Sequence, residues 1–383
     1  MPLDQETRDQ LIDSVRRFVS ERLVPLEDKV ARDDAVPDDI VEEMRELGLF
    51  GLSIPSEYGG LGLTMEEEVL VCFELGKTSP AFRSVIGTNV GIGSQGVVMF
   101  GRDDQKKEWL PKLASGEAIA SFCLTEPGAG SDAASVRTSA VRKGNSHYVV
   151  NGTKRFITNA NKASVFTLMA RTDPANKGAG GISAFFVPSN LKGITIGKPE
   201  RKMGQQGAHI CDVVFEDCHV PADCLLGQEG QGFRVAMQVL DRGRIHIGAV
   251  CVGVAERLIR DAAKYALERE QFGQKIAEFQ LIQAMLADSQ TEMYAARCMI
   301  LDAARLRDAG ANVTMEAACA KYFASEMVGR VADRAVQIYG GAGYVSDYGV
   351  ERFYRDVRIF RIYEGTSQVQ QLVIARNLLK SLG

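Results

Sequence analysis

Hydrophobic residues recur with a helical period through the first third of the chain. One stripe runs through 11–23, where apolar side chains fall every three or four residues, and it stops before Pro25. Similar stripes occupy 39–47, 65–76 and 103–113, and glycine-rich turns separate them. This pattern predicts that the chain is entirely helical up to about residue 115.

The periodicity changes between 118 and 225. Short runs rich in β-branched and aromatic residues, bounded by Gly, Asn, Asp and Pro, follow one another there: FCLTE, SHYVVNG, SVFTLMART, GISAFFV and CDVVFED. These runs predict β-strands. Because helices come before and after the strands, with no alternation of strand and helix, the order argues against a Rossmann sheet.

The C-terminal part of the chain is free of proline, since all 11 prolines fall within the first 221 residues. A proline inside a helix destabilises it by about 3 kcal/mol, so such a stretch suits long helices. Helical patterns run through 233–270, 279–309, 315–339 and 367–382. The predicted fold is mainly α with a central β-domain: an N-terminal helical domain (1–118), a middle β-barrel or sandwich (119–228) and a C-terminal four-helix bundle (229–383).

Composition narrows the class of protein. The 383 residues are 45% hydrophobic and 25% charged, as in ordinary globular proteins. The net charge of -4, from 45 basic and 49 acidic residues, gives no field that would attract nucleic acid. No uncharged apolar run reaches the roughly 18 residues of a membrane span. The start, MPLDQETRDQ, resembles neither a signal nor a transit peptide, so we expect a cytoplasmic protein, or a mitochondrial matrix protein whose presequence has been removed.

Several kinds of site find no support in the sequence. The eight cysteines form no CxxC pair and are expected to be reduced, buried thiols. The His and Cys residues between 209 and 224 do not have the spacing of zinc ligands, so no metal is predicted. The chain also lacks a GxSxG elbow, an HExxH pair, a Walker P-loop and a GxGxxG turn.

Two segments of the predicted β-domain place polar residues at strand ends. FCLTEPGAGSD (122–132) runs from a strand into a glycine turn, which either faces a ligand or is only a tight turn. KRFITN (154–159) places Phe156 and Thr158 on one strand face, which would suit a flat aromatic cofactor and is equally compatible with ordinary strand packing.

Three further segments lie at the ends of predicted helices. EREQFG (268–273) carries Arg269, which either pairs with phosphate or is a solvated helix end. QIYGGAGY (337–344) has more glycines than a helix cap needs. In RIYEGTSQ (361–368), Glu364 precedes a Gly-Thr-Ser sequence that opens the last helix, where it either does chemistry or serves only the helix dipole.

Taken together, these segments resemble the acyl-CoA dehydrogenase family of flavoproteins over essentially the whole chain. The matching stretches occur in the family's order: CLTEPGAGSD (123–132), NGTKRFITNA (151–160), VFEDCHVP (214–221), YALEREQFG (265–273), QIYGGAGY (337–344) and IYEGTSQVQ (362–370). The resemblance implies a helical, a β and a four-helix domain, FAD between the last two, and a homotetramer built as a dimer of dimers.

The resemblance also implies the reaction. Glu364 would remove the α-proton of an acyl-CoA thioester while a hydride passes from the β-carbon to flavin N5, which gives a trans-2-enoyl-CoA. The electrons would then pass to an electron-transfer flavoprotein. The Glu364 backbone amide and the flavin ribityl chain would stabilise the enolate oxygen. Burial is expected to raise the pKa of Glu364 more than the nearby helix N-terminus lowers it.

The remaining site residues are carried over from the family position by position. The residues implied to bind FAD are Phe122, Leu124, Thr125, Ser131, Phe156, Thr158, Arg269, Phe272, Gln280, Gln337, Gly340, Gly341, Thr366 and Gln368. Of these, the residues from Arg269 to Gly341 would act across the dimer interface. The residues implied to bind substrate are Ser131, Asp241, Arg244 and Gly365.

Two departures from the family pattern matter. Many members have tryptophan where this chain has Phe156, which leaves a smaller surface against the flavin. Some members carry their base on a bundle helix, at the position that is Gly243 here, and glycine cannot serve. This second departure favours Glu364.

Other readings of the same scaffold stay open at this point. The chain could be an oxidase or another flavin-dependent relative, or a non-catalytic subunit that binds acyl-CoA or flavin. Retention of Glu364 and of the flavin motifs counts against the last. The identity of the acyl group is not predicted. Segment 87–96, rich in small residues, either lines the far end of the acyl pocket or packs helices closely.

Overall fold

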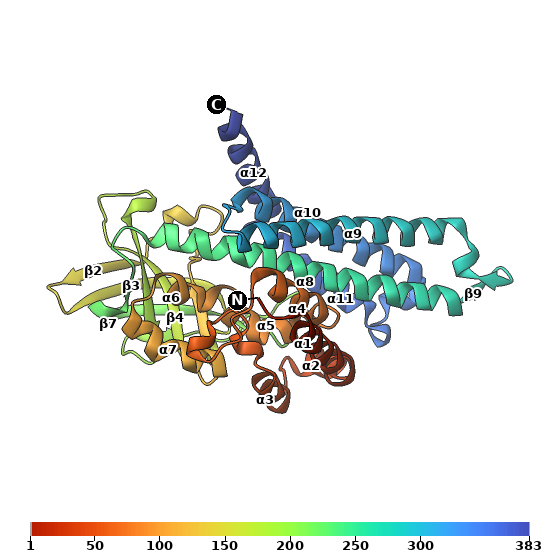
Figure 1. The fold of residues 1–383 in the computed structure, drawn as a ribbon, viewed down its shortest axis with the longest axis horizontal. Helices are drawn as coiled ribbons and strands as arrows, with labels where there is room; N and C mark the ends of the chain where they lie inside the picture. The colour runs from red at the N-terminus through yellow and green to blue at the C-terminus, as the bar shows by residue number, and fades with distance from the viewer. Residues whose placement is uncertain (1, 383) are drawn as a thin grey trace.

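The computed structural model describes residues 2–382. Its sheet lies at one end of the long axis, the long C-terminal helices run to the other end, and the N-terminal helices lie below the middle in Figure 1. The N-terminal domain is helical, as the apolar stripes predict. Its helices are α1 (Gln5–Phe18), α2 (Glu27–Asp33), α3 (Asp38–Glu46), α4 (Met65–Leu75), α5 (Pro80–Thr88), α6 (Gln95–Phe100) and α7 (Asp103–Ser115). A π-helical turn, η5 (Asn89–Gly93), joins α5 to α6 and consists of small and apolar residues.

Helix α4 links this domain to the rest of the molecule. Thr64 caps it, since its hydroxyl accepts from the backbone N–H of Glu67 while the Glu67 carboxylate accepts from the backbone N–H of Thr64. Its residues are buried almost throughout because it packs against both α8 and α9 of the C-terminal domain. Helix α4 therefore brings the N-terminal domain against the middle of α8.

The middle domain is one eight-stranded sheet. Its strands are β1 (Ala120–Cys123), β2 (Ser139–Lys143), β3 (His147–Thr158), β4 (Val165–Arg171), β5 (Ile182–Pro188), β6 (Ile194–Ile196), β7 (Ile210–Pro221) and β8 (Leu225–Leu226). The path is β6-β7-β3-β2-β4-β5-β8, and β1 pairs in parallel with β4. Long strands β3 and β7 are antiparallel, and their register shifts between Lys154 and Ile157, which is a β-bulge.

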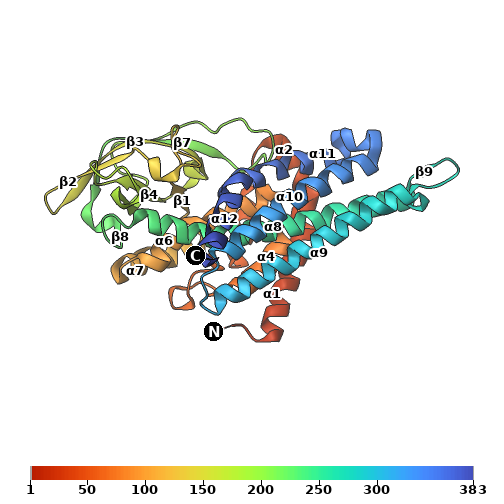
Figure 2. The same ribbon diagram turned by 90° about the horizontal axis from the view of Figure 1, so that it is seen from above.

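The C-terminal domain is built on helix α8 (Gly232–Glu268), which runs from the sheet to the far end of the molecule (Figures 1 and 2). Helices α9 (Gln280–Asp308) and α10 (Thr314–Tyr339) pack along it, and the hairpin of β9 (Glu270–Gln271) and β10 (Gln274–Lys275) forms the tip. After the short helix α11 (Val350–Asp356), α12 (Ser367–Leu382) packs against α10, and its end projects from the body.

The predicted fold class is confirmed: the chain is mainly helical with a central sheet. We propose the predicted division at 118 and 228, because both positions fall in connecting segments between α7 and β1 and between β8 and α8. The cysteine prediction was partly wrong. All eight thiols are free, but Cys224 and Cys319 are only half-buried and Cys298 is exposed, since it lies on the outer face of α9. Between residues 2 and 382, none of the helices has the length and apolarity needed to cross a membrane.

Candidate active site

Glu364 lies in the joint between a 3-10 turn (Val357–Arg361) and α12, at φ 53. A non-glycine residue in this left-handed region carries roughly 1–3 kcal/mol of strain. Its carboxylate is turned inward, and the Oε2 atom is buried without a hydrogen-bond partner among the described residues. Burial raises the pKa of Glu364, against the opposing charges of Arg83, Lys321 and Arg244. The pKa is thus raised already in the ligand-free chain, and the shift expected once substrate closes the site stays a prediction.

Two side chains bind the backbone carbonyls of the joint that contains Glu364. Lys321 of α10 is fully buried, and its ammonium donates to the carbonyl of Gly365 (2.7 Å). The amide of Gln370, one turn into α12, donates to the carbonyls of Glu364 (3.0 Å) and Gly365 (3.1 Å). Burial lowers the pKa of Lys321 to about 8. The strained backbone at Glu364 is therefore fixed by hydrogen bonds from two neighbouring helices.

The first turn of α12 is capped as the sequence predicts. The hydroxyl of Thr366 accepts from the backbone N–H of Val369 (3.2 Å), which makes Thr366 the cap residue. Ser367 is buried and donates to Glu326 (2.5 Å), which also pairs with Arg361 (3.1 Å). These contacts pin the start of α12 to α10.

Helix α8 lies against the Glu364 carboxylate at Gly243. A Cβ built on Gly243 would lie less than 3.0 Å from Oε2 of Glu364 and 3.0 Å from Cγ2 of Ile92 in η5. The absence of a side chain at Gly243 thus makes the space that the Glu364 carboxylate occupies. Gly243, which has no side chain that could act as a base, thus leaves room for the carboxylate of Glu364.

Asp241 and Arg244, the predicted substrate contacts, form an ion pair on the same stretch of α8. A guanidinium nitrogen of Arg244 donates to Asp241 (2.6 Å), and the hydroxyl of Thr314 donates to the second oxygen of Asp241 (2.8 Å). Both residues of the pair are largely shielded from solvent. The pair lies next to Gly243, so the structure brings Asp241, Arg244, Glu364 and Gly365 into one region.

The two predicted flavin segments of the sheet lie side by side. Lys154 is fully buried and donates to the carbonyl of Leu124 (3.1 Å) and to Glu126 (2.7 Å). Burial would raise the pKa of Glu126, but Lys154 and hydrogen bonds from neighbouring residues lower it. The backbone of Arg155 donates to Thr125 (2.8 Å), and the Ser121 hydroxyl donates to the carbonyl of Thr158 (2.7 Å).

The bulge in β3 gives Phe156 an unusual position. Phe156 has φ 58 and its side chain is 52% exposed, while Lys154 and Ile157 on either side of it are buried. Thr158 is half-buried and Ser131 is exposed in the loop after β1, where Cβ atoms built on Gly128 and Gly130 would meet nothing within 4 Å. Phe122 and Leu124 are buried. Phe156 thus offers an exposed aromatic face, and the hydrogen bond from Arg155 to Thr125 joins its strand to the segment that leads into the open glycine loop.

A third set of predicted residues lies far from these two. Arg269 ends α8, Phe272 is 94% exposed in the β9–β10 hairpin, and Gln280 begins α9. Gln337, Gly340 and Gly341 lie at the end of α10, which meets the same part of α8 because Tyr339 stacks on Tyr265 (4.2 Å). At 1.5 Å per residue, the helix puts Arg269 about 39 Å from Gly243. One chain does not bring this set together with Glu364.

Sequence reasoning missed two cations near Glu364. Arg83 and Lys321 are both buried and both lower the pKa of Glu364. The sequence contains a signal for Arg83, since it is the sole charged residue between Lys77 and Arg102. No comparable signal marks Lys321, which lies within an ordinary amphipathic helix.

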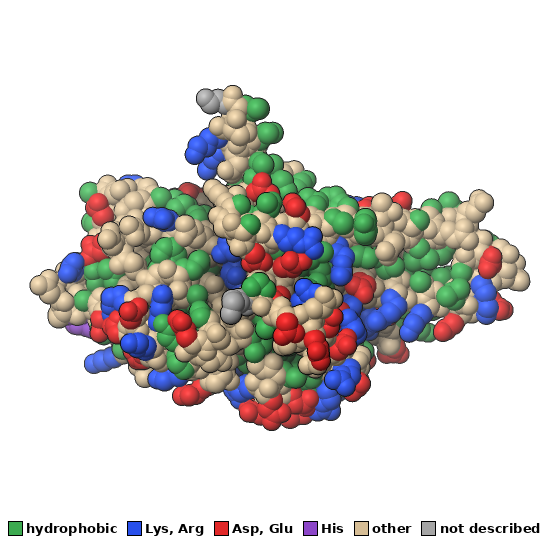
Figure 3. Space-filling view, in the orientation of Figure 1, with side chains coloured by type: hydrophobic (Ala, Val, Ile, Leu, Met, Phe, Trp, Pro, Cys, Tyr) green, Lys and Arg blue, Asp and Glu red, His purple; other side chains and the backbone are tan. Residues whose placement is uncertain are grey.

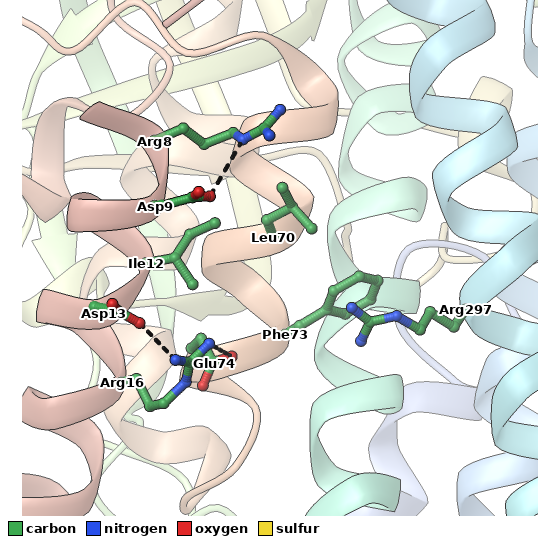
Figure 4. Close-up of a pocket in the computed structure, with 9 residues that line it drawn as sticks. All are labelled: Arg8, Asp9, Ile12, Asp13, Arg16, Leu70, Phe73, Glu74 and Arg297. Carbon is green, nitrogen blue, oxygen red and sulfur yellow. Dashed lines mark hydrogen bonds and ion pairs between the residues drawn. The ribbon is translucent and has the colours of Figure 1, made fainter. Parts of the chain in front are cut away.

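A cavity of the described structure lies elsewhere (Figure 4). It measures about 430 Å³ and lies between α1, α4 and α9, lined in part by Arg16, Phe73 and Arg297. Its charged groups are already used: Arg16 pairs with Asp13 (2.5 Å) and Glu74 (3.3 Å), and Arg297 lies over the ring of Phe73. None of the predicted site residues lines this cavity, and the described residues contain no cluster of three or more metal-type ligands.

Comparisons with known proteins agree with this geometry. The chain matches the N-terminal (5–117), middle (121–218) and C-terminal (230–379) domains of acyl-CoA dehydrogenases. It is 41% identical to an acyl-CoA dehydrogenase of Bacillus subtilis, over 95% of this chain and 96% of that protein. It is 40% identical to the caffeyl-CoA reductase-Etf complex subunit CarC of Acetobacterium woodii, over 97% and 98% of the two chains.

A solved structure shares the fold over its full length. Butyryl-CoA dehydrogenase from Megasphaera elsdenii superposes with a TM-score of 0.95 at 36% identity, covering 99% of each chain. The chain therefore belongs to the acyl-CoA dehydrogenase family and is an oxidoreductase that acts on acyl-CoA with FAD as its cofactor.

Proposed function

We propose that this protein dehydrogenates an acyl-CoA thioester between its α- and β-carbons, with Glu364 as the base, and passes the electrons to an electron-transfer flavoprotein. The observation that carries the proposal is the Glu364 carboxylate, whose Oε2 atom is buried, without a partner, against a helix position that has no side chain. A carboxylate in this state is poised to accept a proton, because burial disfavours its charged form.

The residues at the strand ends fit a flat aromatic cofactor. Phe156 offers a half-exposed ring, and the open loop with Gly128 and Gly130 leaves backbone amides free to approach it. When bound, FAD supplies an acceptor for the hydride that leaves the β-carbon. The residues that would hold it from this chain are Phe122, Leu124, Thr125, Ser131, Phe156, Thr158, Thr366 and Gln368, and those from a second copy are Arg269, Phe272, Gln280, Gln337, Gly340 and Gly341.

The backbone around Glu364 has a second task in this proposal. The backbone N–H of Glu364 donates no hydrogen bond to any described residue. By contrast, the carbonyls of Glu364 and Gly365 both accept hydrogen bonds from Gln370. A free N–H beside the base can donate to the thioester oxygen as negative charge develops there, and such donors contribute about 3 kcal/mol. Lys321 and Gln370 keep this N–H in place because they fix the two carbonyls.

We also propose a homotetramer. The hairpin residue Phe272, Leu281 at the start of α9 and Tyr344 after α10 are exposed in the single chain. Figure 3 shows further apolar side chains on the projecting end of α12, where Leu372, Leu379 and Leu382 are exposed. Two separate apolar areas on one chain suit the two interfaces of a dimer of dimers.

A second candidate is the reverse reaction, reduction of an enoyl-CoA, with Glu364 returning a proton to the α-carbon. The observation that favours it is the 40% identity to the caffeyl-CoA reductase-Etf complex subunit. The same residues serve both directions, so the geometry does not choose between them.

The proposal is tested on the purified holoenzyme. The protein should be yellow, and anaerobic addition of an acyl-CoA should bleach it; an added electron-transfer flavoprotein should then restore the colour faster than air does. Rapid recovery in air alone would indicate an oxidase, and a colourless protein that takes up no FAD would contradict the proposal. Light scattering on the same sample gives the oligomeric state.

A further inference from the structure

Arg83 in α5 is a buried cation without a counter-ion. It is 6% exposed, and its Nε is buried without a hydrogen-bond partner. No described carboxylate approaches its guanidinium closely enough for an ion pair. By contrast, the two other buried arginines nearby are paired, Arg242 with Glu68 and Arg244 with Asp241. A buried unpaired guanidinium is strongly unfavourable, so an anion from outside the chain is expected to complete it.

The position of Arg83 relates it to the base. Its guanidinium lies over Gly87, where a built Cβ would come within 3.0 Å of it, and a Cβ built on Gly91 would lie 3.7 Å from a terminal nitrogen of Arg83 and 3.1 Å from Nδ1 of His246. Arg83 therefore lies between η5 and α8. His246 is three residues after Gly243, so both lie on one face of α8.

Glu364 borders the same face of α8. Its carboxylate lies against Gly243, which also faces Ile92 of η5, the residue that follows Gly91. Of the cations that act on Glu364, Arg83 has the largest effect in lowering its pKa. The base and the unpaired guanidinium are therefore neighbours across a strip of small residues, and neither is paired with the other.

The carboxylates of Glu68 and Glu364 interact with the charge of Arg83, but neither forms an ion pair with it. Glu68 is engaged by Arg242, and one of its oxygens lies 3.5 Å from His246. His246 is fully buried, and burial lowers its pKa well below the usual value, so it is neutral. A side chain at 87 or 91 would meet the guanidinium of Arg83, so the two glycines keep side-chain atoms away from it.

We propose that Arg83 binds a carboxylate at the far end of the acyl group, so that the substrates are thioesters of dicarboxylic acids with CoA. This inference rests on the proposed function, since Glu364 must act on the α-carbon of the same molecule. A guanidinium binds a carboxylate through two parallel hydrogen bonds, which an alkyl end cannot form. An uncharged acyl chain would leave the buried cation unpaired, and sites of this kind discriminate by about 10²-fold or more.

The test compares pairs of substrates that differ in one charge. The holoenzyme is bleached anaerobically with succinyl-, glutaryl- and adipyl-CoA and with the terminal amide of each, which has nearly the same shape without the charge. At least one carboxylate should exceed its own amide by about 100-fold in kcat/KM. Equal rates within every pair, or a general preference for the amides, would overturn the inference.

Variants of Arg83 separate recognition from folding. Arg83→Gln should lose the preference for the carboxylate, so that the rates with the carboxylate and with its amide differ by no more than a few-fold, and Arg83→Lys should keep part of the preference. Because loss of this cation also raises the pKa of Glu364, the two rates are compared within the variant and on the high-pH plateau. If Arg83→Gln lowers the rates with the carboxylate and with the amide by the same factor, the role of Arg83 is structural and the inference is wrong. If the variant does not fold, the ratio measured on the parent protein decides. Bleaching by uncharged thioesters alone would sink this inference and leave the proposed function standing, whereas no bleaching by any thioester would sink both.

Discussion

The joint at Glu364 and the hairpin at Phe272 use the same backbone device in opposite surroundings. Each places a non-glycine residue in the left-handed region, at φ 53 and φ 52, and each is followed by a glycine with positive φ. Glu364 is held by Lys321 and Gln370, whereas Phe272 is 94% exposed and touches the edge of Phe279 alone among the aromatic rings. Strain at the first position is balanced within the chain.

The contrast shows which part of the proposed site a single chain supports by its own contacts and which part it does not. The surroundings of Glu364, the proposed base, are built from contacts between α8, α10 and α12 of one chain. The predicted cofactor contacts at the tip have no such support, and a strained, exposed aromatic residue is expected to gain it from another copy. Variants at the first position should therefore change chemistry, and variants at the tip should change assembly and cofactor binding.

The largest effect is expected for Glu364→Gln. The amide keeps the shape and the contacts of the joint but cannot accept a proton, so the rate of anaerobic bleaching should fall by about 10²–10⁴-fold while the protein stays yellow. Stopped-flow absorbance measures this rate. Glu46→Gln, at an exposed position of α3, is the matched control and should bleach normally. Bleaching of Glu364→Gln at the parent rate would place the base elsewhere.

A smaller effect is expected for Gly243→Ala. The new methyl group would meet the Glu364 carboxylate at less than 3.0 Å, so the carboxylate must move, and the rate should fall by about 10–100-fold. The matched control is Gly248→Ala on the same helix, where the methyl group meets Ile300 instead. That variant should lower the melting temperature more than it lowers the rate. The comparison fails if both variants lose rate and stability in equal proportion.

Replacing Lys321 with methionine should shift the pH profile. Burial raises the pKa of Glu364 and the charge of Lys321 opposes this, so removal of the charge raises the pKa further. Because the carboxylate is the active form, kcat/KM falls as pH drops through this pKa, and the acid limb should move to higher pH. Loss of the hydrogen bond to Gly365 should lower the plateau by about tenfold. Lys321→Arg keeps the charge and should keep the position of the limb; an unchanged limb in Lys321→Met would remove Lys321 from the electrostatics of the base.

Sequence reasoning reached the fold because it depends on local signals, whereas the prediction that Glu364 is the base came from the resemblance of its segment to the family. Apolar periodicity and the absence of proline mark the helices, and the Gly-Thr-Ser cap marks the start of α12. No comparable pattern in the sequence marks the bulge in β3. Strict alternation would put Lys154 and Phe156 on one face, yet Lys154 is buried and Phe156 is half-exposed, because the extra residue at the bulge resets the alternation.

Contacts between distant segments were also beyond the sequence. Lys321 and Glu364 are 43 residues apart, and their proximity depends on how α12 packs on α10. Whether Arg83 of α5 has an ion-pair partner depends on how three helices pack. Glu68 comes from α4, and Arg242, which pairs with it, comes from α8. A single charge in an apolar stretch is visible in a sequence, but whether it is paired is a property of the packed structure.

The smallest effect is expected at the tip, for Phe272→Ala. The side chain makes almost no contact within the chain, so the free energy of unfolding of the monomer should change by less than about 0.5 kcal/mol. If a second copy covers Phe272, the affinity for FAD and the fraction of tetramer at low concentration should both fall, by about threefold, because one residue of an interface usually carries little of its energy. Fluorescence titration of the apoprotein and light scattering measure the two quantities. Val141→Ala, which removes part of an exposed apolar side chain from β2, should change neither. A loss of monomer stability with unchanged FAD affinity would mean that the hairpin supports its own chain, and the contrast with the Glu364 joint would disappear.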